Sequence, residues 1–95
     1  MRAKTEIEVR NEFLDHIRSI AKYWAELPGK NSQERCDGVA FSILNIFDGS
    51  TMLPAMNISL LPHPEDKQYH IDEGKNWYEP KMIINDCMLH EVYFK

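Results

Sequence analysis

Apolar residues recur at three- and four-residue spacings through two consecutive stretches, Thr5 to Leu27 and Ser32 to Phe47. This spacing predicts two amphipathic helices, each with a broad apolar face. The first helix starts with a capping-box pattern at Thr5 and Glu8, and Pro28 ends it because the residue before a proline is pushed out of the helical region. The two stretches therefore account for most of the first half of the chain.

The second stretch has two candidate N-caps, Asn31 and Ser32, and apolar residues around most of its surface. We expect it to be the innermost helix of the fold. A rival interpretation takes Val39 to Phe47 as a buried strand, but the upstream cap favours a helix. Gly38 would then cost about 1 kcal/mol relative to alanine unless a neighbour packs closely against it.

Downstream of these stretches, Ala55 to Leu61 alternates apolar and polar residues between two prolines, which predicts one strand. A strand needs a partner for its backbone amides, and three are available. These are Met82 to Ile84, Glu91 to Phe94, and the same strand of another copy.

Two short helices complete the predicted elements. One lies within Pro64 to Glu73, and a last helix runs through Leu89 and Val92 with Asn85-Asp86 as its cap. Residues 1–95 then form a single domain of the α+β class, in which two main helices pack on a small two- to three-stranded antiparallel sheet.

Composition narrows the class of protein. With 43% hydrophobic and 11% aromatic residues the chain is globular, and a net charge of −4 disfavours nucleic-acid binding. No apolar run is long enough to cross a membrane, and the N-terminus lacks a signal-peptide core, which predicts a cytoplasmic protein. In that compartment we expect Cys36 and Cys87 to be reduced, small buried thiols rather than a disulfide.

Candidate chemistry is confined to the polar segment from His63 to Tyr78. Asp66 and His70 are four apart and would share a helix face, so they could hold a divalent metal with His63 or Glu73 completing the set. His70 could also act as the general base of a small hydrolase, oriented by Asp66 or Asp72. No established ligand motif is present and a small chain has little room for a pocket, so a solvated polar face is the favoured interpretation and no cofactor is required.

Trp77 and Tyr78 are large aromatic residues in a turn-rich stretch. They either close the edge of the core, which we favour, or anchor a partner-binding surface.

The stretch from Glu34 to Gly49 (ERCDGVAFSILNIFDG), followed by Leu53-Pro-Ala and by His63-Pro-Glu-Asp-Lys67, resembles a family of small bacterial and phage proteins of about this length. The resemblance covers roughly residues 20 to 95. It implies a bacterial or phage source and brings no activity, ligand or site residue with it.

These observations favour a small non-enzymatic cytoplasmic protein that self-associates, for example as a homodimer, or binds a protein partner. Two alternatives stay open: the metal-binding protein or hydrolase using His63, Asp66 and His70, and an acidic inhibitor of a nucleic-acid enzyme. If the apolar residues of the first half are committed to the core, any working surface lies toward the C-terminal half.

Overall fold

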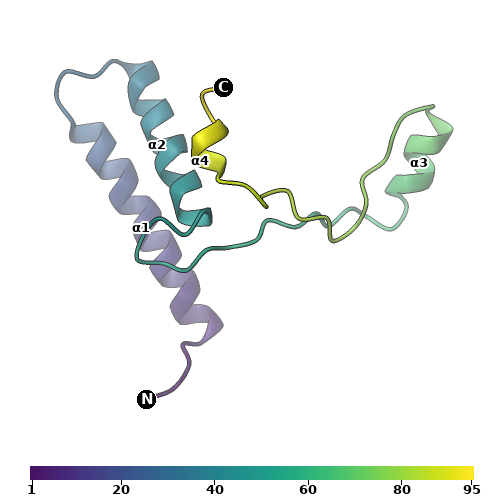
Figure 1. Cartoon of the computed structure of the whole chain (residues 1–95), viewed down its shortest axis with the longest axis horizontal. Helices are drawn as coiled ribbons and strands as arrows, with labels where there is room; N and C mark the ends of the chain where they lie inside the picture. Colours follow the sequence, from purple (N-terminus) through teal and green to yellow (C-terminus); the bar gives the residue numbers. More distant parts are fainter.

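The computed structural model describes residues 1–95 and contains four helices. They are α1 (Glu6–Glu26), α2 (Ser32–Phe47), α3 (Asp66–Asp72) and α4 (Leu89–Val92). α1 and α2 form an antiparallel hairpin, and α4 packs against α2 (Figure 1). We call these three helices, with residues 48–56, the body. Residues 57–84 form a long segment that projects from the body and returns to it, with α3 at its far end, and we call this segment the arm.

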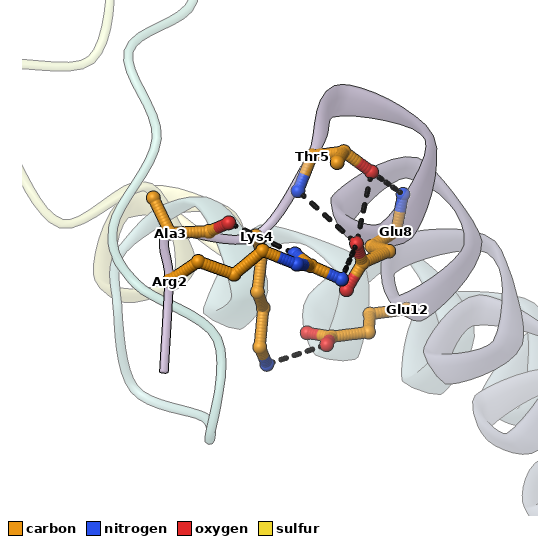
Figure 2. Close-up of polar contacts among 6 residues, drawn as sticks. All are labelled: Arg2, Ala3, Lys4, Thr5, Glu8 and Glu12. Carbon is orange, nitrogen blue, oxygen red and sulfur yellow. Dashed lines mark hydrogen bonds and ion pairs between the residues drawn. The ribbon is translucent and has the colours of Figure 1, made fainter.

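The start of α1 follows its sequence signal. The Thr5 hydroxyl accepts a hydrogen bond from the Glu8 amide at 3.2 Å, and the Glu8 carboxylate accepts one from the Thr5 amide at 3.5 Å (Figure 2). Arg2 adds an ion pair to the same carboxylate at 2.8 Å, and Lys4 pairs with Glu12. The predicted capping box is therefore confirmed.

α2 is the central helix of the body, because it contacts both α1 and α4. Asn31 is its N-cap and accepts a hydrogen bond from the Glu34 amide at 2.8 Å, so the strand interpretation of this stretch is wrong. Gly38 is buried against the Trp24 indole, where a Cβ would lie 2.4 Å from the ring. Its presence inside a helix is explained by this close approach.

The predicted α+β class is wrong. The structure is 51% helical with only 2% strand, and it contains no sheet on which the helices could pack. One antiparallel bridge joins Ser59 to Ile83, so of the three possible partners for the 55–61 segment it is Met82 to Ile84 that lies beside it. The main helices instead pack on each other, and no third strand extends the pair.

Hydrogen bonds around this bridge hold the base of the arm together. The Leu60 amide donates to the Met82 carbonyl at 2.9 Å, and the Ile84 amide donates to the Ile58 carbonyl at 3.0 Å. The Asn85 side chain continues the pattern, accepting from the Ile58 amide at 2.7 Å and donating to the Met56 carbonyl at 2.6 Å. Asn85 thus replaces a strand residue, and the prediction that Asn85-Asp86 caps the last helix is wrong.

The core is much smaller than the apolar stripes predict. Only 5 of the 95 residues are buried, and the hydrophobic ones are Ile20, Ile46 and Leu53. Phe13, Trp24 and several aliphatic side chains pack around them while staying partly exposed. The expectation that the apolar residues of the first half are spent on the core is therefore overturned, because α1 and α2 each have a face that nothing covers.

We predict that Gly38→Ala destabilises the protein by roughly 1–3 kcal/mol, because the added methyl group would overlap the Trp24 ring. Urea unfolding monitored by circular dichroism measures the change. The sign of the change in the free energy of unfolding tests the close contact, because in a helix without that contact the same substitution stabilises by about 1 kcal/mol. A Gly38→Ala variant more stable than the wild type would contradict the packing described.

Candidate interaction surface

A shallow apolar groove of about 580 Å³ runs between α1 and α2. Its lining combines small side chains with the larger Trp24, Val39 and Ile43. The full lining is Ala21, Trp24, Ala25, Ser32, Arg35, Cys36, Val39, Ala40 and Ile43. Ala21, Ala25 and Cys36 are exposed in the single chain. An apolar groove on the surface is more typical of a binding site than of the solvent-facing surface of a monomer.

Arg35 is the one charged residue that lines this groove. Its Nη2 donates to the carbonyl of Leu27, the C-cap of α1, at 3.0 Å. Its Nε is buried and has no hydrogen-bond partner. Arg35 thus gives the apolar groove one positive charge.

A second hollow, of about 340 Å³, lies at the tip of the arm and includes both aromatic residues singled out in the sequence. Trp77 is 40% exposed and Tyr78 is 61% exposed, so neither closes the core. The Trp77 Nε1 donates to Glu79 at 2.9 Å, and the Lys67 ammonium lies 4.9 Å from the centre of the indole ring. The favoured prediction that these residues plug the core is wrong, because they contact other residues of the arm and stay partly exposed.

The residues predicted to hold a metal are all in or beside α3. The Asp66 carboxylate accepts from the backbone amide of His63 at 3.2 Å. His70 Nδ1 lies 2.7 Å from the backbone carbonyl of Asp66, and its ring packs edge-on against Tyr78. No three His, Cys, Asp or Glu side chains converge on a point where they could hold a metal ion. The local turn and helix explain these contacts without a ligand.

An Asp–His pair that sequence reasoning missed lies where α2 meets α4. Asp48 is 9% exposed and accepts hydrogen bonds from the Leu89 and His90 amides, both at 2.8 Å. His90 Nδ1 lies 2.5 Å from the same carboxylate, and its ring packs edge-on against Phe41. Asp48 thus caps the first turn of α4 from a distant part of the chain. These contacts tie α4 to the end of α2.

Cys36 and Cys87 are both free, as expected, but both are exposed rather than buried. Cys36 lies in the groove, while Cys87 lies next to the base of the arm.

No family model, curated protein sequence or solved structure matches this chain. The resemblance to small bacterial and phage proteins therefore stays a prediction. None of the four helices combines the length and the apolar character that crossing a bilayer requires.

We predict that acid releases α4 from α2. Burial alone would raise the pKa of the Asp48 carboxyl, but hydrogen bonds from His90 and Leu89 outweigh it and hold the pKa below its ordinary value of 3.8. A depressed pKa contributes stability that is present above the ordinary value and is lost as the pH falls through the folded-state pKa. Amide hydrogen exchange of Leu89 and His90 should therefore accelerate as the pH falls below this value, once corrected for intrinsic rates.

The matched variant is Asp48→Asn, which keeps the shape but removes the charge. We expect it to lose about 1–3 kcal/mol at neutral pH and to flatten the acid dependence. An unchanged acid dependence in this variant would show that another carboxyl carries the effect.

Proposed function

We propose that this protein is a non-enzymatic binding protein that works by self-association, with the homodimer as its functional unit. The observation that carries the proposal is the amount of surface the single chain leaves uncovered. Its accessible surface is 7638 Å². A compact monomer of 11.2 kDa exposes about 5,700 Å², so this chain exposes about 1,900 Å² more.

That excess is larger than a standard protein interface requires, since each partner buries about 800 Å². The shape points the same way. The radius of gyration is 17.3 Å, against about 12 Å for a compact chain of 95 residues. The extra surface is also apolar, as Leu61, Tyr78 and Ile84 are 94%, 61% and 49% exposed. A second copy supplies the cover with no need for another gene product.

The other functions considered from the sequence draw less support. No cluster of ligands favours a metal-dependent hydrolase at His63, Asp66 and His70. The acidic residues of α1 are interspersed with basic ones and are partly ion-paired, as at Glu6 with Arg10 and Asp15 with Arg18. This mixture of charges does not favour an acidic surface that imitates nucleic acid.

We also propose a cytoplasmic location. Two exposed, unpaired cysteines support it, because such thiols persist in reducing compartments.

Light scattering coupled to size-exclusion chromatography tests the association. We expect a mass close to twice the 11.2 kDa of the chain, and a melting temperature that rises with protein concentration. A constant melting temperature and a mass of one chain at every concentration would overturn the proposal. A monomer that instead retains a distinct protein partner would place the same surfaces in a hetero-complex.

A further inference from the structure

We propose that the two copies exchange arms: the aromatic tip of each arm, at Trp77 and Tyr78, seats in the α1–α2 groove of the other copy. This inference rests on the proposed self-association and says which surfaces meet. It assigns a function to two exposed features of the molecule, the apolar groove and the aromatic tip of the arm.

The arm has no partner within its own chain. α3 contacts none of the other helices, and the arm projects from the body with its tip far from α1 and α2 (Figure 1). Trp77 and Tyr78 keep 40% and 61% of their surface exposed in the single chain, so both have area left to cover. The groove of about 580 Å³, with its mostly apolar lining, has the volume and the character that such side chains need.

Charge favours the same pairing. The arm carries five carboxylates and three lysines, and Glu79 follows directly after the two aromatic residues. The groove carries a single charge, the Arg35 guanidinium. A carboxylate that arrives with the aromatic tip would lie near this positive charge, and the two opposite charges attract each other. The contact between two grooves would instead bring two like charges together, which costs free energy.

Reciprocal exchange of the arms also limits the assembly to two copies. Each copy offers one arm and one groove, so a two-fold axis forms two identical contacts and leaves neither surface free. The excess surface of about 1,900 Å² per chain suffices for two contacts of about 800 Å² per chain.

Two variants test the pairing, one on each surface. Ala25→Glu places a charge at an exposed position of the groove lining, and Trp77→Ala removes the larger aromatic residue of the tip. Both positions are exposed in the single chain, so the body should fold in each variant. We expect the dissociation constant of the dimer to rise at least about tenfold in both. Ser19→Glu is the control, because Ser19 is exposed and lies about 200° round α1 from Ala21; it should leave the constant within about twofold.

Mixing the two variants separates arm exchange from other dimers. A pair of one Ala25→Glu chain and one Trp77→Ala chain still has one intact arm and one intact groove that meet. Native mass spectrometry with a mass-tagged chain should therefore detect a mixed dimer at concentrations where neither variant associates alone. A dimer weakened only by Ala25→Glu would indicate groove-to-groove contact, and one weakened only by Trp77→Ala would indicate contact between arms; either result overturns the exchange.

Cys36 gives an independent measurement on the unmodified protein. It lines the groove, whereas Cys87 is exposed outside it. Alkylation of Cys36 should slow as protein concentration rises, while alkylation of Cys87 serves as the internal reference. A wild-type dimer in which Cys36 stays as reactive as in the monomer would overturn the arm exchange and leave the proposed self-association standing. A wild-type monomer would overturn both.

Discussion

The contact between the Trp24 indole and the backbone of α2 at Gly38 sets the distance between the two main helices. Because residue 38 has no Cβ, the ring lies where any other side chain would stand, and its Nε1 donates to Ser42 at 3.0 Å. With the helices fixed in this way, the ring forms part of the wall of two hollows. One is the apolar groove, and the other is a hollow of about 330 Å³ that also borders Phe41 and Phe94. The contact between Trp24 and Gly38 therefore both holds α1 against α2 and places the indole ring beside the two surface hollows.

Local signals predicted the helices well, and they predicted the assembly of those helices poorly. The caps at Thr5 and Asn31 fix where α1 and α2 begin because the donors and acceptors lie three residues apart. Burial is different, since an apolar stripe shows that a face seeks cover and does not show what covers it. The two stripes that predicted a core therefore line an open groove, with Ala21 from α1 and Ile43 from α2.

Two polar residues show the same limit. Asp48 looks like the turn residue that ends a helix, and Asn85 looks like a helix cap. Asp48 contacts His90 and Asn85 contacts Met56, and each pair is more than 25 residues apart in the sequence. No local sequence pattern predicts contacts of this range. Of the candidate site residues, Trp77 and Tyr78 are the ones that our proposal uses, and their role as partner-binding residues stays a prediction. The groove that we pair with them could not be found without the helix packing.

The arm is fixed at its base and free at its tip, and this asymmetry bears on how it could bind. The Asn85 side chain hydrogen-bonds to the backbone of Met56 and Ile58 and so fixes the base of the arm. Four residues after Asn85, the Leu89 amide donates to Asp48, which holds α4 at the end of α2. A two-stranded ribbon and a seven-residue helix are marginal on their own, so the far end of the arm gains most from a partner surface. Because the base already orients the segment, less conformational entropy is lost when the tip docks. The polar contacts at the base thereby favour association without touching the partner.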